Sequence, residues 1–315
     1  MGVIKLTMAG FENHAGFTIS NSKLQLVEVV YKNGQFVLDN VDEAYFNEPL
    51  NLETDKETKI SSLLQGAFNE LLIKRPLKSF FASFTLPFEL FNIMQVPYDN
   101  TLLHQDLVEE FRWELSLLYP YSANKDFTIQ YIEVEKNNLI DFNSAIVIAL
   151  ARKYLQLILN FCANNNLQLK FVDNIHLASE RALSISYPMA NRGIILSVYF
   201  NNKYLSLIFS VDGKPVKLNV IPLTDVGEIP SLLLTETTSN ASFKINRNSI
   251  NAAFITGDEI SGTIVQSLKN ALGIEFISFN PFDKIKPEPA LFDNKYFAEK
   301  FNSFSPAAGI AYRLA

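Results

Sequence analysis

The sequence predicts an α/β fold of two lobes. The chain has 315 residues, of which 48% are hydrophobic, enough to bury more than one packed core. Residues 16–29, GFTISNSKLQLVEV, alternate between apolar and polar on both sides of a short polar turn, which predicts a strand, a turn and a second strand. A similar pattern recurs in residues 194–216, IILSVYFNNKYLSLIFSVDGKPV. Because each pattern opens one half of the chain, we expect one sheet in each lobe.

The first lobe is expected to contain a sheet followed by a helix. Residues 16–48 predict a meander of three strands, with a hairpin turn at residues 32–35, KNGQ. Apolar residues then recur at helical spacing from Leu63 to Leu72, and Pro76 ends the pattern.

A compact unit of sheet and two helices is predicted at residues 83–164, before the first lobe resumes. It begins with two short strands within residues 80–98 and an amphipathic helix at residues 102–118. The strand patterns FTIQYIEVE and SAIVIALA follow, and then a helix from Tyr154 to Asn164.

Composition and charge exclude several functions. The net charge of −6 and the absence of a basic stripe argue against nucleic-acid binding. Cys162 is the only cysteine, so the chain has no internal disulfide, and its apolar helical context predicts a buried residue rather than a nucleophile. The longest apolar segment is interrupted by Arg152 and Lys153, and residues 1–7 are too short for a signal peptide. We therefore expect a cytoplasmic protein.

The sequence contains no recognisable catalytic or metal-binding constellation. His14, His104 and His176 are scattered and have no metal-ligand spacing. The helix at residues 102–118 has an acidic face that is expected to meet water, formed by Asp106, Glu109, Glu110 and Glu114. Trp113 on the same helix is expected to pack in the core, with a role as an anchor for a partner as the alternative.

Six landmarks in order along the chain resemble the PilM family of type IV pilus assembly proteins, actin-like relatives of the division protein FtsA. They are GFTISNSKLQLVEV, the pair Leu86-Pro87 and Val96-Pro97, FRWELSLLYPYS, SAIVIALARKY with LQLKFVDN, NAAFITGDEISGTIVQSLKNALGIEFISFNPF and SFSPAAGIAYRLA. The resemblance covers nearly the whole chain and implies an actin-like, ribonuclease H-like fold.

The resemblance also implies a division of the chain. Lobe 1 would comprise residues 1–190, with subdomain 1A at 1–82 and 165–190 and the inserted subdomain 1C at 83–164. Lobe 2 would comprise residues 191–315. Its subdomain 2B, which in the family covers the adenine base, would be reduced to a loop at about 222–250, because this segment contains the polar run TETTSNAS.

The nucleotide site implied by the resemblance has lost the residues that it needs. Active relatives have an aspartate before each of two phosphate-binding turns, where this chain has Thr18 and Tyr199. Neither residue supplies the carboxylate that would offset a metal–triphosphate, and a tyrosine hydroxyl is neutral at pH 7. The other positions of the degenerate cleft are Ser20, Asn21 and Ser22 in the first turn, Asn201 and Asn202 in the second, and the pair Gly257 and Asp258.

We therefore expect a vestigial site without catalytic residues, metal, ATP or ATP hydrolysis. The simpler interpretation of the same residues is that Thr18 and Tyr199 are ordinary strand residues and that Ser20-Asn21-Ser22 is a hairpin turn without a ligand.

The resemblance implies a cytoplasmic scaffold that lies near the inner membrane because it binds the tail of a membrane-anchored partner. In the family the tail occupies the cleft between lobe 1 and the inserted subdomain, so its walls are expected at residues 83–97 and 102–118. Residues 80–86 are expected to form an edge strand that accepts the peptide. Whether the chain also forms a homo-oligomer is left open.

Two alternatives remain from the sequence. One is a divergent actin-like ATPase that still binds ATP and Mg²⁺. The other is an FtsA-like filament protein, against which stands the end of the sequence at Ala315 without an amphipathic membrane-targeting tail.

Overall fold

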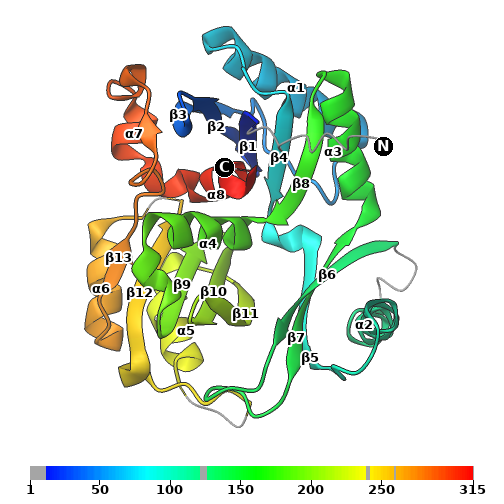
Figure 1. The fold of residues 1–315 in the computed structure, drawn as a ribbon, viewed down its shortest axis with the longest axis vertical. Helices are drawn as coiled ribbons and strands as arrows, with labels where there is room; N and C mark the ends of the chain where they lie inside the picture. Colours follow the sequence, from blue (N-terminus) through cyan, green and yellow to red (C-terminus); the bar gives the residue numbers. More distant parts are fainter. Residues whose placement is uncertain (1–11, 121–125, 239–241, 259, 315) are drawn as a thin grey trace, which may run out of the picture.

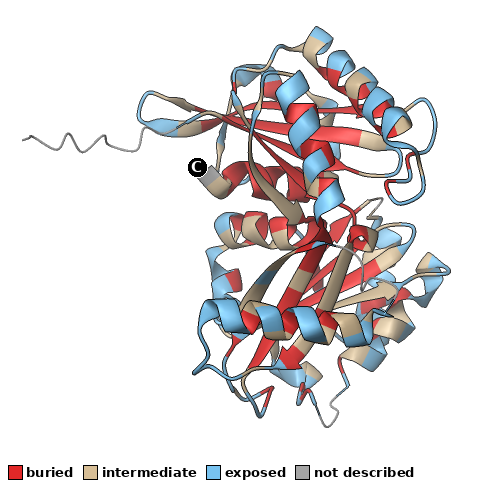
Figure 2. Ribbon diagram, turned by 90° about the vertical axis from the view of Figure 1, so that its right-hand side faces the viewer, coloured by how far each residue is buried: buried red, intermediate tan, exposed pale blue. Residues whose placement is uncertain are grey.

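The computed structural model describes residues 12–120, 126–238, 242–258 and 260–314. Two sheets covered by helices form two lobes, and a smaller unit with its own sheet extends from the side of the molecule (Figure 1). The strands in both lobes are largely buried, whereas the outer surfaces of the surrounding helices are exposed (Figure 2). The predicted α/β, two-lobe architecture with an inserted subdomain is therefore confirmed.

Lobe 1 is built on a six-stranded sheet with the order β14-β3-β2-β1-β4-β8. The predicted meander forms because Asn33 and Gly34 adopt φ angles of 51° and 83°, as a tight hairpin turn requires. On β1, Phe17 faces α1 and α3, whereas Gly16 faces α8 on the opposite side of the sheet. The strands are β1 (His14–Ile19), β2 (Lys23–Lys32), β3 (Gln35–Tyr45), β4 (Phe81–Leu86), β8 (Gln168–Asn174) and β14 (Lys286–Pro287), and the helices are α1 (Glu57–Lys74), α3 (Arg152–Asn164), α4 (Ile175–Ser186), α7 (Lys295–Glu299) and α8 (Ser305–Ala311).

The inserted unit is a three-stranded antiparallel sheet with one helix on its outer face (Figure 1). The helix buries Leu107, Phe111 and Leu115 against the sheet, as the helical spacing predicts. Trp113 is 59% exposed, so the prediction that it packs in the core is wrong. The elements are β5 (Phe91–Pro97), α2 (His104–Leu118), β6 (Phe127–Val134) and β7 (Ser144–Ala151), in the strand order β5-β7-β6.

Lobe 2 contains a five-stranded sheet with the order β11-β10-β9-β12-β13. Of the described residues between β11 and β12, only Ile229–Glu236 form an α-helix, and they pack against the next helix of the lobe. The expected loop at 222–250 therefore contains a short helix, while part of the polar run, residues 239–241, lies outside the described residues. The elements are β9 (Ile194–Phe200), β10 (Tyr204–Val211), β11 (Lys214–Pro222), α5 (Ile229–Glu236), β12 (Ile250–Gly257), α6 (Gly262–Leu272) and β13 (Phe276–Ser278).

The lobes divide the chain differently from the sequence-based boundaries. The strand β4 lies inside the sheet of lobe 1, between β1 and β8, so the inserted unit begins after it. The helix α3, expected in the inserted unit, packs against α1 and β8 of lobe 1. After β13 the chain returns to lobe 1, where β14 pairs with β3 and α8 packs against β1. The expected assignment of all residues from 191 to 315 to lobe 2 therefore does not hold.

Two helices, α4 and α8, lie together where the lobes meet (Figure 1). A Cβ atom at Gly309 of α8 would overlap the carbonyl oxygen of Ala178 on α4, so the helices approach to backbone contact. Hydroxyl groups form a hydrogen-bond network in the same region. The Oγ atom of Ser179 on α4 lies 3.1 Å from Oγ1 of Thr256 on β12, and it donates to Oγ of Ser305 on α8 at 2.8 Å. Lobe 2 is thus joined to lobe 1 through a buried contact between α4, α8 and β12.

Candidate functional site

In the turn between β1 and β2, backbone N–H groups are hydrogen-bonded to a side chain of the turn itself. The Ser20 hydroxyl oxygen accepts hydrogen bonds from the backbone N–H of Ser22 at 3.3 Å and of Lys23 at 3.1 Å. The backbone N–H of Ser20 donates to the carbonyl oxygen of Lys23 at 3.0 Å. These three N–H groups are therefore already paired within the turn.

The turn between β9 and β10 has the same chemistry. The side-chain oxygen of Asn201 accepts from the N–H groups of Lys203 at 2.9 Å and Tyr204 at 2.8 Å. The N–H of Asn201 donates to the carbonyl oxygen of Tyr204 at 3.0 Å. A phosphate-binding turn needs N–H groups that point at the ligand. In these two turns, the side-chain oxygen atoms of Ser20 and Asn201 accept hydrogen bonds from two N–H groups each.

Thr18 and Tyr199 are both buried, and neither side chain is a carboxylate. The Thr18 hydroxyl is buried in lobe 1 and accepts a hydrogen bond of 2.8 Å from the hydroxyl of Thr85, so it does not line the cleft. Tyr199 is also buried, and its ring packs against Phe88 and His176. Burial, together with the charge of Asp258, raises the pKa of Tyr199 well above its ordinary value, so the hydroxyl is neutral.

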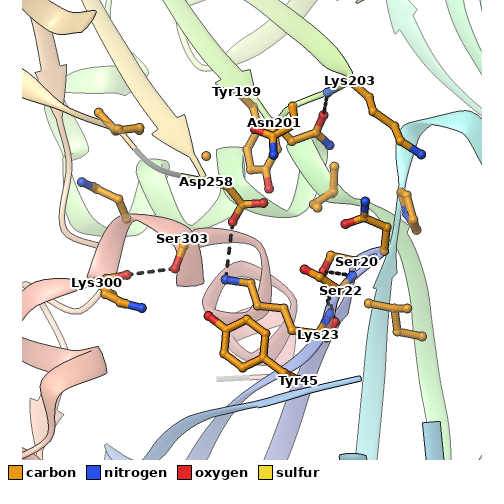
Figure 3. A pocket seen from close by; sticks show the side chains of 18 of the residues that line it. Ser20, Ser22, Lys23, Tyr45, Tyr199, Asn201, Lys203, Asp258, Lys300 and Ser303 are labelled. Atoms are coloured by element: carbon orange, nitrogen blue, oxygen red, sulfur yellow. Dashed lines mark hydrogen bonds and ion pairs between the residues drawn. The ribbon is translucent and has the colours of Figure 1, made fainter. Parts of the chain in front are cut away.

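The third loop of the site, at the end of β12, brings an acidic group across the cleft. Gly257 has a φ of 140°, and a Cβ atom there would overlap the carbonyl oxygen of Phe200, so glycine is required. The next residue, Asp258, places its Oδ1 atom 3.6 Å from the Nζ atom of Lys23, which follows the first turn (Figure 3). This ion pair joins lobe 2 to lobe 1.

Lys23 is held in this position by a buried carboxylate of its own lobe. Its Nζ atom donates to Oε2 of Glu43 at 3.0 Å, and Gln25 and Tyr45 also donate to the Glu43 carboxylate. Burial alone would raise the pKa of Glu43, but the Lys23 charge and these hydrogen bonds outweigh it and hold the pKa below its ordinary value. The Lys23 ammonium is therefore a fixed positive charge between two carboxylates at the cleft.

A cleft of about 360 Å³ separates the three loops. Of the predicted site residues, Thr18 alone is absent from its lining, and the structure brings the other eight together. Five charged residues of the lining were not predicted from the sequence: Lys23, Glu89, Lys203, Glu299 and Lys300. Only Lys23 and Lys203 had a local signal, because they adjoin the predicted turns. The cleft lining is formed by residues 19–23, Tyr45, Pro87, Glu89, Ile175, Tyr199, residues 201–203, Gly257, Asp258, Ile260, Glu299, Lys300, Asn302 and Ser303.

A second, larger groove of about 580 Å³ lies between the inserted unit and lobe 1, and Gly213 and Pro215 of lobe 2 also line it. Strands β6 and β8 line it, and each is an edge strand of its sheet. The predicted cleft therefore exists, but α2 and β4 do not line it, and the internal position of β4 shows that the proposed edge strand at residues 80–86 is wrong. Apolar side chains dominate the walls of the groove, including Phe91, Ile132, Leu150, Leu155, Leu177 and Ile185.

Charged side chains of both signs lie on the β8 and α4 side of this groove. The Asp173 carboxylate pairs with Arg313 at 3.3 Å and with Arg181 at 3.6 Å. Lys170 stacks on the ring of Phe81, with its Nζ atom 3.7 Å from the ring centre. Glu180 on α4 completes the charged wall.

Glu180 is protonated more readily than an ordinary glutamate. Burial raises its pKa from 4.5 to about 7. The Nε2 atom of His176 lies 4.0 Å away, but burial lowers the pKa of His176 to about 3, so the imidazole is neutral and provides no counter-charge. The groove therefore contains a carboxyl group that changes its charge near neutral pH.

We expect the difference in unfolding free energy between Glu180→Gln and the wild type to change in favour of the variant as the pH increases from 4.5 to about 7. In this window the folded wild type retains a proton that the unfolded chain has released, so wild-type stability falls with rising pH. Glutamine has no such proton, and the relative gain should be on the order of 2 kcal/mol across the window. Urea denaturation at several pH values measures it, with Glu57→Gln on the exposed first turn of α1 as the control. Parallel pH curves for wild type and Glu180→Gln would contradict the assignment.

The three histidines and the cysteine lie apart from one another, and each histidine has hydrogen-bond partners of its own. His14 is hydrogen-bonded to the Ala311 carbonyl and to Ser83, and His104 to Tyr131. Cys162 is buried, as expected, and burial raises its pKa to about 12. Within the described ranges, no three His, Cys, Asp or Glu side chains are grouped so as to hold a metal ion. No α-helix in the same ranges is both long and apolar enough to cross a membrane.

Two α/β lobes around a cleft, each opened by a strand–turn–strand unit, define an actin-like ATPase fold. Among solved structures, the chain is similar to one described as the PilM–PilN type IV pilus biogenesis complex, with a TM-score of 0.72 at 17% identity, covering 96% of this chain and 98% of the other. It is also similar to a Bacteroides thetaiotaomicron protein with an actin-like ATPase fold and unknown function, with a TM-score of 0.51 at 12% identity, covering 90% and 97% of the two chains. No protein-family model and no curated protein sequence matches the chain. The fold implied by the resemblance to PilM is therefore confirmed.

Proposed function

We propose that this protein is a non-catalytic scaffold on the cytoplasmic side of the inner membrane, which binds the cytoplasmic tail of a membrane-anchored partner in a pilus or secretion assembly. The similar fold occurs in a structure described as a complex of PilM with PilN in type IV pilus biogenesis. The observation that supports tail binding is the groove between the inserted unit and lobe 1.

The groove suits an extended peptide better than a compact ligand. Its edge strands, β6 and β8, provide unpaired backbone groups to which a further strand can hydrogen-bond. The apolar wall offers pockets for alternate side chains of that strand, and a volume of about 580 Å³ is within the range of ligand-binding clefts. An apolar tail segment therefore fits the chemistry of the groove.

The absence of catalysis is proposed from the two turns of the cleft. The backbone N–H groups of Ser22 and Lys23 are paired with the Ser20 side chain, and those of Lys203 and Tyr204 are paired with the Asn201 side chain. Thr18 and Tyr199 offer no carboxylate to offset a metal ion. In addition, the Lys23–Asp258 ion pair links the two lobes where a bound ligand would otherwise link them. These contacts therefore occupy hydrogen-bonding and charged groups that a nucleotide would otherwise use.

Tail binding is tested with labelled peptides that represent the cytoplasmic tails of membrane proteins encoded beside this chain. Fluorescence anisotropy should give a micromolar or lower dissociation constant for one of them, whereas a scrambled peptide of the same composition should not bind. Failure of every tail would remove the proposal.

Magnesium ATP is expected to leave the melting temperature of the protein unchanged. A ligand present at 100 times its dissociation constant would stabilise the folded state by about 2.7 kcal/mol, which raises the melting temperature by several degrees. A thermal-shift series with magnesium ATP measures this, and sodium phosphate at equal ionic strength is the control. A rise that saturates with ATP and requires magnesium would instead support the divergent ATPase.

A further inference from the structure

One face of α2 is only partly covered by the rest of the described structure. Asp106, Glu110, Trp113 and Leu117 follow one another at helical spacing on this face, which we call the α2 stripe. It points away from the inserted sheet, against which Leu107, Phe111 and Leu115 are buried. The outward surface of α2 is largely exposed (Figure 2).

The stripe has an acidic half and an apolar half. In the apolar half, Trp113 is 59% exposed and Leu117 is 57% exposed, which leaves two large side chains one helical turn apart in solvent. The acidic half consists of Asp106 and Glu110, because the neighbouring Glu109 is paired with Arg112 of the same helix at 3.6 Å. The Oε2 atom of Glu110 is shielded from solvent and has no hydrogen-bond partner among the described residues.

We propose that the α2 stripe docks a basic amphipathic helix of a second partner protein. Trp113 and Leu117 would pack against its apolar side chains, and Asp106 and Glu110 would pair with its lysine or arginine side chains. Charge favours this partner over two other possible occupants, a membrane surface and a second copy of the chain. An anionic membrane is repelled by the acidic half, and a second copy of this chain, with a net charge of −6, meets like charge.

This surface is separate from the groove assigned to the tail. In β6, Tyr131 contacts Phe111 of α2 and also lines the groove, whereas the alternate residues Thr128, Gln130 and Ile132 line the groove from the opposite face of the strand. The helix therefore covers one face of the inserted sheet and the groove lies at the other. Both partners can bind at once, so the inserted unit joins the tail to a further component of the assembly.

Trp113 is the only tryptophan in the chain, so its fluorescence reports directly on the stripe. The probe is a synthetic amphipathic helix of lysine and leucine, added to the full-length protein. We expect the tryptophan emission to move to shorter wavelength with a saturable dependence on the peptide, and binding to weaken with added salt. A scrambled peptide of the same composition and a glutamate–leucine helix should not produce the shift.

Variants separate docking on the stripe from non-specific attraction. Leu117→Lys should weaken binding about tenfold, whereas Ile73→Lys on α1 should not. Glu110→Lys should lose affinity for the lysine–leucine helix and gain affinity for the glutamate–leucine helix. An equal response to the scrambled peptide, or no response to the basic helix, would overturn the proposal. So would a blue shift on vesicles of phosphatidylcholine and phosphatidylserine, or one that depends on protein concentration alone. A failure of tail peptides to bind the groove would leave these results unchanged.

Discussion

Replacing Ile185 by aspartate is expected to weaken binding of the partner tail by about a hundredfold. Ile185 lines the groove between the inserted unit and lobe 1, and it is 38% exposed, so it contributes to the binding wall without being part of the core. Burying its side chain against a peptide contributes about 1.5–3 kcal/mol, and an aspartate in its place must also lose its hydration. Anisotropy titrations of the wild type and the variant with the same peptide measure the change.

A matched control is provided by Ile73→Asp. Ile73 is the penultimate residue of α1, just as Ile185 is the penultimate residue of α4, but it is 85% exposed and lies outside the groove. The urea concentration at the midpoint of unfolding should be nearly the same for both variants and the wild type. Equal tail affinities for the two variants would show that the tail binds elsewhere.

Replacing Gly309 by alanine is expected to destabilise the protein by about 3 kcal/mol. A Cβ atom at this position would overlap the carbonyl oxygen of Ala178, which is backbone and cannot rotate away. Helices α4 and α8 would have to separate, and the buried hydrogen bonds of Ser179 with Thr256 and Ser305 would weaken with them. Urea denaturation measures the change in the free energy of unfolding.

Gly66→Ala is the control for the same substitution in a helix. Gly66 lies in the interior of α1, and nothing lies within 4 Å of the Cβ atom that alanine would add. Because alanine is the better helix former, this variant should be more stable than the wild type by about 0.5–1 kcal/mol. A Gly309→Ala variant as stable as Gly66→Ala would show that the two helices are not packed as closely as described.

The local elements could be predicted from sequence because their signals are local. Alternation in β1, β2 and β3, the Asn33-Gly34 turn and the apolar spacing of α1 and α2 each depend on neighbours within a few residues. Most of the cleft was instead implied by the resemblance to PilM. Eight predicted positions meet there because turns that follow the first strand of each sheet face one another in this fold.

Several predictions about which segments become neighbours were wrong. The alternation of β4 indicates a strand but not its neighbours, so residues 80–86 were expected at an edge although they lie between β1 and β8. Trp113 was expected in the core because its apolar character does not show whether another element covers α2. Lys300 and Ser303 reach the cleft from the segment that returns to lobe 1, and nothing near them in the sequence signals this.

The sequence by itself determined the order and type of most elements, since these depend only on which residues occur and at what spacing. Only the tertiary structure decided that Ser20 and Asn201 pair with the N–H groups of their own turns, that Lys23 reaches Asp258 across the cleft, and that β6 and β8 line the groove. The physical reason is that hydrogen bonds, ion pairs and free strand edges depend on which segments lie side by side after folding, and the spacing of residues along the chain does not specify those neighbours.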